Sequence, residues 1–226
     1  MPPPQIASTH GTAVQSRAAV RIVDPSTVFE TGRRYLMRSD PRLAAVIRRT
    51  GRIRPSFDHR PPFEALVRAV ISQQLSTKAA DTIRGRVMAL LPTLTPEALL
   101  TVPVTDLRAA GLSGQKIAYL RDLSERVADG RLDLHALRDM RDEEIIEIIV
   151  AVKGFGVWTA QMFLMFSLHR PDILPTGDLG IVKGMQRVLA MKSRPSVRTM
   201  ERAAKVWQPY RSIACWYLWR SLEMPD

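Results

Sequence analysis

The apolar residues of this chain recur at the three- and four-residue spacing that places side chains on one face of an α-helix. The pattern is clear over residues 145–152, where four apolar side chains at this spacing precede the sequence Gly-Phe-Gly. It resumes from Val157 to Leu168. The residues of this second run that we expect to face inward are Ala160, Phe163 and Leu164. The two runs predict a pair of helices joined by a tight turn at the glycines.

The same spacing, together with helix start signals, predicts helices along most of the remaining chain. Asp, Ser and Thr stand where N-caps are expected, and proline stands at several first helical positions. Further helices are expected after Asp24-Pro25, from Asp40-Pro41 to Ile47, over 62–74, 76–91, 113–130, 179–189, 196–206 and 209–222, and, as short helices, at the caps Thr95 and Thr105. No convincing period-two strand of useful length occurs. The pattern therefore predicts an all-α fold.

Size and cysteine content limit the architecture and the kinds of site. A chain of 226 residues with 46% hydrophobic content can bury a core as one domain or as two small lobes. The single cysteine, Cys215, excludes a disulfide framework, a four-cysteine iron–sulfur cluster and a cysteine-rich zinc site. Residues 1–22 begin with Met-Pro-Pro-Pro and contain no acidic residue, so we expect a disordered tail there.

Positive charge is the compositional feature that bears most on function. The 33 Lys and Arg residues against 22 Asp and Glu give a net charge of +11, which favours a nucleic-acid partner, although an anionic membrane surface attracts the same charge. Nine arginines lie between Arg33 and Arg60 and are expected to form a solvated basic face. No apolar run reaches the length of a membrane span and the N-terminus lacks the apolar segment of a secretory signal, so we expect an intracellular protein.

The turn between the two central helices carries two glycines, Gly154 and Gly156, on either side of Phe155. Glycines at both positions permit positive φ and leave backbone N–H groups uncovered at the start of the second helix. Such groups form a small anion site that suits a phosphate. The same residues also fit an αα-hairpin in which the glycines only make the turn. Spacing alone does not decide between these interpretations.

A lone carboxylate and an indole lie near this turn. Asp178 directly precedes the helical run from Leu179, so its ordinary role would be an N-cap. The positive end of the helix also favours an ionised carboxylate, as a group facing a developing cation requires. Trp158 lies in the first turn after the glycines, next to whatever the turn binds. Trp207 and Trp216 are interpreted as core residues.

Two of these segments, VKGFGVWTAQMF and LPTGDLGIVKG, resemble the signature of the helix-hairpin-helix (HhH-GPD) DNA glycosylases. Within that superfamily the chain looks like the alkylation-repair branch, the 3-methyladenine DNA glycosylase II (AlkA/MAG) family. Further matching segments are FEALVRAVISQQLSTKAA, GLSGQKIAYLRDL and WQPYRSIACWYLW. Together the matches cover the chain from about Phe63 to Trp219.

The resemblance implies a fold of two helical lobes with a helix-hairpin-helix motif and an active-site cleft between them. The central lobe would span about 67–172, and the second lobe would combine 23–66 with 173–226. The resemblance also implies double-stranded DNA with alkylated bases as the partner, action as a monomer, and a cytoplasmic, nucleoid-associated location, or a nuclear one in a eukaryote.

Family roles are carried over to the matching positions only. Asp178 corresponds to the essential carboxylate. The base pocket would be formed by Trp158, Trp219, Met162 and Leu179. Contacts to DNA would come from Gln74, Leu75, Lys153, Gly154, Phe155 and Gly156, with Leu75 as the wedge that fills the gap left by the flipped nucleotide. The backbone carbonyls of Val150, Val152 and Phe155 would hold a monovalent cation, Na⁺ or K⁺, and no iron–sulfur cluster or other cofactor is expected.

The resemblance also implies whether the enzyme only removes the base or also cleaves the strand. Bifunctional relatives carry a Schiff-base lysine where Trp158 stands, so a monofunctional glycosylase that leaves an abasic site is expected. Lys153 and Lys183 are nearby but off this position and are interpreted as phosphate contacts or solvated charges. Some members have a tyrosine in place of Met162 and an aromatic residue in place of Leu179, so the pocket would be less aromatic and base preference stays open.

A fixed carboxylate beside an indole also suits this chemistry on physical grounds. Cleavage of an N-glycosidic bond passes through an oxocarbenium-like sugar, which a fixed carboxylate stabilises. An alkylated purine already carries positive charge, so it leaves readily and stacks on tryptophan through cation–π attraction. Two alternatives remain: a glycosylase for another lesion, such as hypoxanthine, uracil or an oxidised purine, and a non-enzymatic DNA-binding module in which Asp178 only caps a helix.

Overall fold

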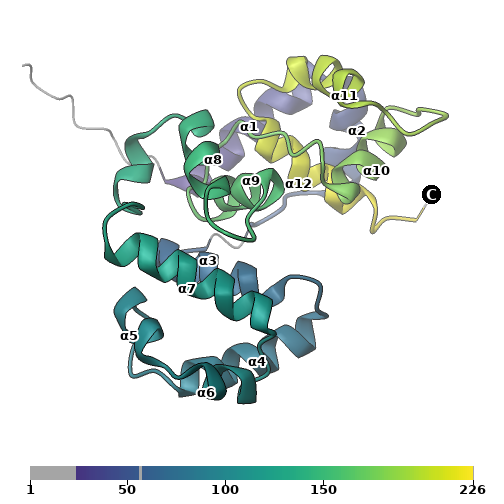
Figure 1. The fold of residues 1–226 in the computed structure, drawn as a ribbon. Coiled ribbons are helices and arrows are strands. Elements are labelled where there is room, and N and C mark those ends of the chain that lie inside the picture. Colours follow the sequence, from purple (N-terminus) through teal and green to yellow (C-terminus); the bar gives the residue numbers. More distant parts are fainter. Residues whose placement is uncertain (1–23, 56–57, 226) are drawn as a thin grey trace, which may run out of the picture.

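The computed structural model describes residues 24–55 and 58–225, and the tail expected at 1–22 lies outside them. Within the described residues every regular element is helical, which confirms the all-α fold (Figure 1). The α-helices are α1 (Pro25–Ser39), α2 (Pro41–Thr50), α3 (Pro62–Ser72), α4 (Thr77–Ala89), α5 (Pro96–Thr101), α6 (Val104–Ala109), α7 (Gly114–Ala128), α8 (Asp142–Val150), α9 (Val157–Phe166), α10 (Leu179–Val188), α11 (Val197–Ala204) and α12 (Arg211–Ser221). Two 3₁₀ turns, η1 (Ala136–Asp139) and η2 (Lys205–Trp207), complete the set.

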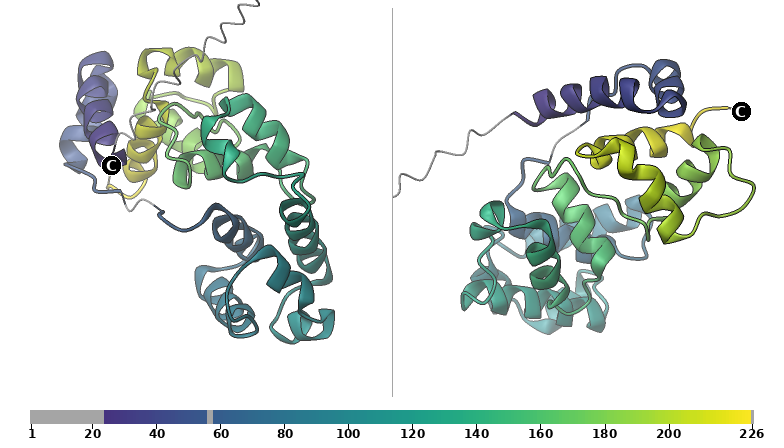
Figure 2. Two further views of the ribbon diagram at one scale, coloured as in Figure 1. Left: turned by 90° about the vertical axis from the view of Figure 1, so that its left-hand side faces the viewer. Right: turned by 90° about the horizontal axis from the view of Figure 1, so that it is seen from above.

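The helices fall into two groups that share one hydrophobic core. In the lower part of Figure 1, α5, α6 and α3 pack against the long helix α7, and α4 packs against α3. The other group joins both ends of the chain, because α1 and α2 pack on α12, which also contacts α10 (Figure 2). The pair α8 and α9 connects the two groups, since α9 packs on α3 and its Phe166 also contacts Trp216 and Trp219 of α12. The lobe boundaries near 67 and 172 stay a prediction.

The close approach of α10 and α12 sets the geometry of the candidate site. Helix α12 is buried on most of its circumference, and residues 213–219 in its middle are all apolar or aromatic. Gly184 of α10 faces it, and a Cβ atom there would lie 2.7 Å from the carbonyl oxygen of Leu218. The missing side chain therefore allows the two helix backbones to come together. This contact brings the start of α10 beside Trp219 near the end of α12.

Local signals predicted most helix starts, with a few errors. The structure confirms side-chain N-caps at Asp40, Ser76, Thr95 and Ser113. Thr105 is not a cap, because α6 begins at Val104 after Pro103. The 3₁₀ turn η1 was not expected, and α8 ends at Val150, so that Val152 lies in the turn rather than in the helix. The inward-facing residues predicted for α9, Ala160, Phe163 and Leu164, are all buried.

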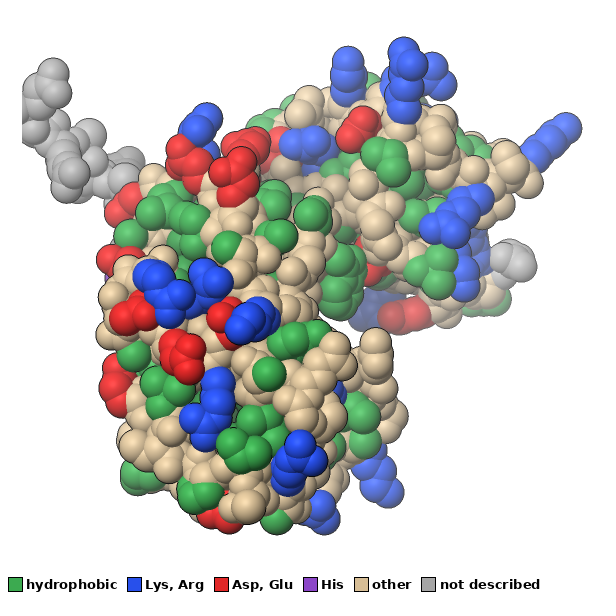
Figure 3. Space-filling view, in the orientation of Figure 1, with side chains coloured by type: hydrophobic (Ala, Val, Ile, Leu, Met, Phe, Trp, Pro, Cys, Tyr) green, Lys and Arg blue, Asp and Glu red, His purple; other side chains and the backbone are tan. Residues whose placement is uncertain are grey.

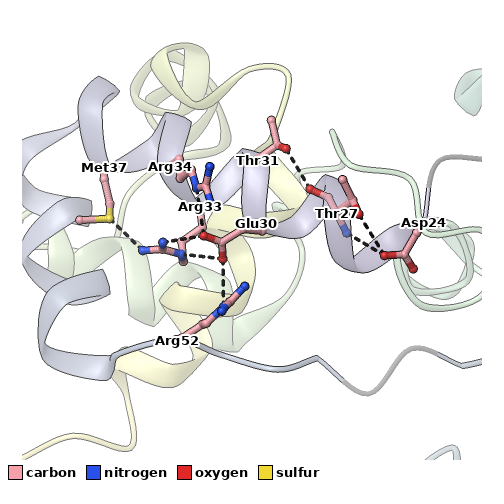
Figure 4. Close-up of polar contacts among 8 residues, drawn as sticks. All are labelled: Asp24, Thr27, Glu30, Thr31, Arg33, Arg34, Met37 and Arg52. Atoms are coloured by element: carbon pink, nitrogen blue, oxygen red, sulfur yellow. Dashed lines mark hydrogen bonds and ion pairs between the residues drawn. The ribbon is translucent and has the colours of Figure 1, made fainter.

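Part of the predicted basic face is paired rather than free. Glu30 of α1 forms ion pairs with Arg33 at 2.7 Å, Arg34 at 3.1 Å and Arg52 at 3.2 Å (Figure 4). The hydrogen bond from Arg33 is the main reason that the pKa of Glu30 is lowered to about 2. Arg52 lies in the segment after α2, so this carboxylate links α1 to that segment. These arginines have a structural role here.

None of the helices in the described part of the chain combines the length and the apolar content needed to span a membrane.

Candidate active site

Asp178 occupies the N-terminus of α10, as the sequence predicts. Its Oδ1 accepts a hydrogen bond from the backbone N–H of Ile181 at 2.9 Å, which is the geometry of a side-chain N-cap. The segment before it turns tightly, because the N–H of Asp178 donates to the carbonyl of Pro175 at 3.0 Å. The side chain is half-buried. The cap role and a reachable carboxylate therefore coexist in one residue.

Two tryptophans hold the carboxylate from opposite parts of the sequence. Trp158 Nε1, on α9, donates to Asp178 Oδ2 at 2.9 Å. Trp219 Nε1, on α12, donates to Asp178 Oδ1 at 2.9 Å. With the amide of Ile181, both oxygens are fixed by neutral N–H donors at the positive end of a helix, an arrangement that complements a negative charge. The two tryptophans assigned to the base pocket thus also orient the carboxylate.

Trp219 is positioned by an aromatic cluster and by a glycine. Its ring stacks on Phe166 with centroids 5.9 Å apart, and Trp216 meets both rings edge-on. A Cβ atom on Gly180 would lie 2.7 Å from Trp219 Cδ1 and 3.0 Å from Asp178 Oδ1. Glycine at 180 therefore leaves room for the indole to reach the carboxylate. Neither Phe166 nor Gly180 was identified from the sequence, although Gly180 lies within the quoted segment LPTGDLGIVKG.

The hairpin is formed by α8, the turn at 151–156 and α9. A pocket of about 720 Å³, within the range of small-molecule sites, opens beside it. Residues of α3, α7 and α9 line it, among them Trp158, Met162 and Phe166. Trp158 is 49% exposed and stands between this pocket and Asp178, whereas Leu179 is 53% exposed on the first turn of α10. The surface is also hollowed between the part formed by α3–α7 and the part formed by α10–α12 (Figure 3). The structure thus places Trp158 and Met162 in one pocket wall and links Trp158 to Asp178 by a hydrogen bond, whereas Asp178, Leu179 and Trp219 do not line this pocket.

The two hairpin glycines are there for different reasons. Gly154 has a φ of 79°, and a Cβ atom on it would lie 2.1 Å from the ring of Tyr119. Gly156 has a φ of −118°, so the positive φ that glycine permits is not used at this position. Apart from its two neighbours in the chain, no described residue has an atom within 4 Å of the place of its missing Cβ, and as the N-cap of α9 it provides no side-chain cap. Gly156 therefore leaves the first N–H groups of α9 open to a ligand, as an anion site requires.

Asp122 of α7 holds the hairpin through a hydrogen bond to its backbone. Its Oδ2 accepts hydrogen bonds from the backbone N–H of Lys153 and from Arg126 Nε, both at 2.9 Å. Burial raises the pKa of Asp122, but these two donors outweigh it and lower the pKa below its ordinary value. The side chain of Lys153 is 70% exposed, so it can reach a phosphate. The side chain of Phe155 is buried, which leaves only its backbone for a ligand.

The turn that would carry the wedge lies between α3 and α4. Gln74 has a φ of 57°, in the left-handed region, and Leu75 is 38% exposed. The residue that contacts the hairpin is Gln73, whose Nε2 donates to the carbonyl of Gly154 at 3.0 Å. Sequence reasoning named Gln74 and overlooked its neighbour. Lys183 is exposed on α10.

The monovalent-cation site at Val150, Val152 and Phe155 stays a prediction. Neutral backbone carbonyls are ligands that suit an alkali cation. The carbonyl of Val152 accepts the N–H of Phe155 at 3.1 Å, and a carbonyl oxygen has a second lone pair for a cation. In the described ranges, no group of three or more His, Cys, Asp or Glu residues could hold a metal ion.

The chain is similar in sequence to a known protein family and to curated proteins. The family described as "HhH-GPD superfamily base excision DNA repair protein" matches residues 67–209. The "DNA-3-methyladenine glycosylase 1" of Schizosaccharomyces pombe is 32% identical over 200 residues, which cover 85% of this chain and 87% of that protein. The match at 67–209 contains the turn with Leu75, the hairpin, Trp158 and Asp178.

Two solved structures resemble the chain in fold and in sequence. One is the S. pombe 3-methyladenine DNA glycosylase (Mag1) in complex with abasic DNA, with a TM-score of 0.77, 31% identity, and coverage of 87% of this chain and 98% of that one. The other is the DNA-3-methyladenine glycosidase of Bacillus halodurans, with a TM-score of 0.78, 38% identity, and coverage of 84% and 88%.

Proposed function

We propose that this chain, which belongs to the HhH-GPD superfamily of base excision DNA repair proteins, is a monofunctional DNA glycosylase for alkylated bases. It hydrolyses the N-glycosidic bond of a flipped nucleotide in double-stranded DNA, releases bases of the 3-methyladenine and 7-methylguanine type, and leaves an abasic site. The observation that carries this proposal is the carboxylate of Asp178, held by Trp158, Trp219 and the amide of Ile181 beside an open pocket.

The carboxylate acts on the sugar. As the bond between C1′ and the base breaks, its electron pair leaves with the base and positive charge develops on the deoxyribose. The ionised carboxylate of Asp178 stabilises that charge, and a water molecule then adds to C1′ and loses a proton. Because the three N–H donors fix both oxygens, the carboxylate does not have to reorganise during the reaction.

Trp158 and the pocket act on the base. A base methylated at N3 or N7 carries positive charge before cleavage, so it needs little acid catalysis. The half-exposed face of Trp158 can stack on such a ring, with cation–π attraction of about 0.5 to 2 kcal/mol. Met162 extends the same wall of the pocket.

The proposed contacts to DNA do not depend on the base sequence of the DNA. The open N–H groups at the start of α9 and the exposed Lys153 bind phosphate, and Leu75 fills the gap that the flipped nucleotide leaves. Flipping costs a few kcal/mol, which these contacts offset. The protein works in the compartment that holds the DNA.

The monofunctional assignment rests on the residue at 158. Its indole N–H is engaged by Asp178 and cannot form a Schiff base. The nearby amine of Lys153 lies 3.8 Å from Asp122 Oδ1. Strand cleavage by the purified protein, with a covalent adduct trapped by borohydride, would contradict this assignment.

Incubation with methylated duplex DNA, followed by chromatography of the released bases, tests the proposal. We expect 3-methyladenine and 7-methylguanine to be released and the strand to stay intact until alkali cleaves the abasic site. An unmethylated duplex serves as the control. Release from duplexes with hypoxanthine, uracil or an oxidised purine, without release of methylated bases, would assign another lesion. DNA binding without release of any of these bases would indicate a binding module.

A further inference from the structure

The turn that carries Leu75 is held by a lysine from another helix. Lys116 of α7 donates from Nζ to the carbonyl of Ile71 at 2.7 Å and to the carbonyl of Gln73 at 2.8 Å. These carbonyls end α3, where a helix leaves its last C=O groups without internal partners and carries partial negative charge. Burial lowers the pKa of Lys116, since its ammonium group is withdrawn from solvent. The lysine thus fixes the start of the turn.

The same turn is connected to the phosphate-binding hairpin. Gln73 accepts from Lys116 through its carbonyl, and its side chain donates to the carbonyl of Gly154 at 3.0 Å. The turn next passes through Gln74 in the left-handed region, a conformation that costs energy for a residue other than glycine. Leu75 follows directly. Anchoring on both sides of Gln73 holds this conformation in place.

Helix α7 holds both elements. Lys116, Tyr119 and Asp122 follow at intervals of three residues, so each is a neighbour of the next along the helix surface and the series winds gradually around the axis. Lys116 binds the turn after α3, Tyr119 covers Gly154, and Asp122 accepts the N–H of Lys153. A hydrogen bond of 2.5 Å from Gln115 Nε2 to the Tyr119 hydroxyl orients the ring. The turn and the hairpin are therefore mounted on one rigid element.

We propose that Lys116 is a positioning residue for base flipping, acting through Gln73 to keep Leu75 at a fixed distance from the phosphate-binding hairpin. This inference rests on the proposed function. The hairpin holds a phosphate and Leu75 enters the stack of the same duplex, so force applied at Leu75 is useful only if the two cannot move apart. Loss of the ammonium group lets the turn shift while the hairpin still binds phosphate. DNA affinity is then kept and flipping is lost.

The test compares Lys116→Met with Lys205→Met, a matched loss of one positive charge at an exposed lysine of η2. Three quantities are measured: the dissociation constant for an undamaged duplex, the fluorescence rise of 2-aminopurine beside an abasic-site analogue, and base release from methylated DNA at saturating enzyme. For Lys116→Met we expect affinity within about 3-fold of the control variant, with the fluorescence rise mostly lost and base release slowed about 10- to 100-fold, in line with loss of hydrogen bonds from a charged donor. Lys116→Arg should restore most of the fluorescence rise and most of the rate of base release.

A second variant guards against loss of fold. Gln73→Leu removes the bond to Gly154 and leaves Lys116 able to bind the carbonyls, and we expect the same pattern with a smaller effect. Hydrogen exchange at residues 73–76 should accelerate in both variants. A wild-type protein that releases no base would contradict the proposed function. A wild type that releases base, with Lys116→Met and Gln73→Leu as fast as Lys205→Met, would contradict this inference alone, as would a drop in melting temperature without a change in flipping.

Discussion

Asp40 and Asp178 have nearly the same local structure. Each caps the N-terminus of a helix through its side chain, α2 for Asp40 and α10 for Asp178. Each also accepts a hydrogen bond from an indole: Trp207 Nε1 donates to Asp40 Oδ2 at 3.0 Å, and Trp158 Nε1 donates to Asp178 Oδ2 at 2.9 Å. The sequence pattern is also alike, because both aspartates directly precede a helical run.

Their surroundings differ in access and in charge. Asp40 is 2% exposed, and its Oδ1 lies 3.2 Å from Arg42 Nε in an ion pair. Asp178 is half-buried beside the exposed ring of Trp158, and among the described residues it forms no ion pair. A carboxylate neutralised by a guanidinium stabilises the fold. A carboxylate held only by neutral donors, and open to a ligand, keeps its charge available for a developing cation.

The largest effect should come from removing each charge in turn. Asp178→Asn should slow base release about 100- to 1000-fold, because the amide cannot stabilise the oxocarbenium-like sugar. Its stability should change little, since asparagine also caps helices. Asp40→Asn should do the reverse and lower the free energy of unfolding by about 1 to 2 kcal/mol, because it removes the charge of a buried carboxylate that accepts hydrogen bonds from Trp207 and from the partly exposed Arg42. Single-turnover base release and urea unfolding measure the two quantities.

Two results with this pair of variants would contradict the distinction between the two aspartates. If Asp178→Asn releases methylated bases at the wild-type rate, Asp178 is only a helix cap. If Asp40→Asn slows base release per folded molecule as much as Asp178→Asn does, access and charge do not separate the two sites.

The indoles should give the second-largest effect. Phenylalanine keeps most of the ring and loses the N–H, so Trp158→Phe and Trp219→Phe should each free one oxygen of Asp178. Loss of a hydrogen bond to a charged group costs about 1.5 to 3 kcal/mol, which corresponds to roughly 10- to 100-fold slower base release. Trp207→Phe is the matched control at Asp40. It should lower stability through the lost bond and the cavity, without a change in the rate per folded molecule.

Equal losses of activity in all three variants would show that the indoles act through the fold. Full activity of Trp219→Phe would show instead that Trp158 and the amide of Ile181 are enough to orient the carboxylate.

The two aspartates also show how much the sequence predicts. The caps at Asp40 and Asp178 and the buried face of α9 follow from local pattern, because a cap and an apolar stripe depend on residues within a few positions. The bonds from Trp219 and Trp207 connect residues 41 and 167 positions apart. Nothing local to either tryptophan specifies its partner, and the assignment of Trp219 to the site came from the resemblance.

Other site residues were not identified from the sequence for the same reason, because their partners lie far away along the chain. Gln73 reaches the hairpin 81 residues away, and Asp122 reaches Lys153 31 residues away. Position 180 has room only for glycine because Trp219 packs against it, and the spacing of residues along the chain does not reveal this contact. Of the two hairpin glycines, only Gly154 needs positive φ, and the sequence does not distinguish them.

Acid should produce the smallest effect, and in the segment from α1 to α2 it should act through Glu30 and Asp40. Glu30 has a pKa lowered from 4.5 to about 2, mainly by the hydrogen bond from Arg33. The pKa of Asp40 is also lowered, because hydrogen bonds from Arg42 and Trp207 outweigh the effect of burial, which raises it. A carboxylate whose folded-state pKa is depressed contributes stability that is complete above its unfolded pKa and is lost as pH falls through the folded one. Stability should therefore decline as pH falls from about 4.5 toward 2.

Urea unfolding at several pH values between 7 and 2.5 measures this decline. Glu30→Gln should lower the free energy of unfolding at pH 7 by on the order of 1 kcal/mol, as expected for a partly exposed ion-pair network. The same variant should show a shallower loss of stability below pH 4.5, because the group that takes up a proton is gone. Glu201→Gln, at an exposed glutamate of α11, is the control and should keep the wild-type pH profile. If Glu30→Gln and Glu201→Gln lose stability in acid with the same slope, the arginines around Glu30 do not stabilise the fold through this carboxylate.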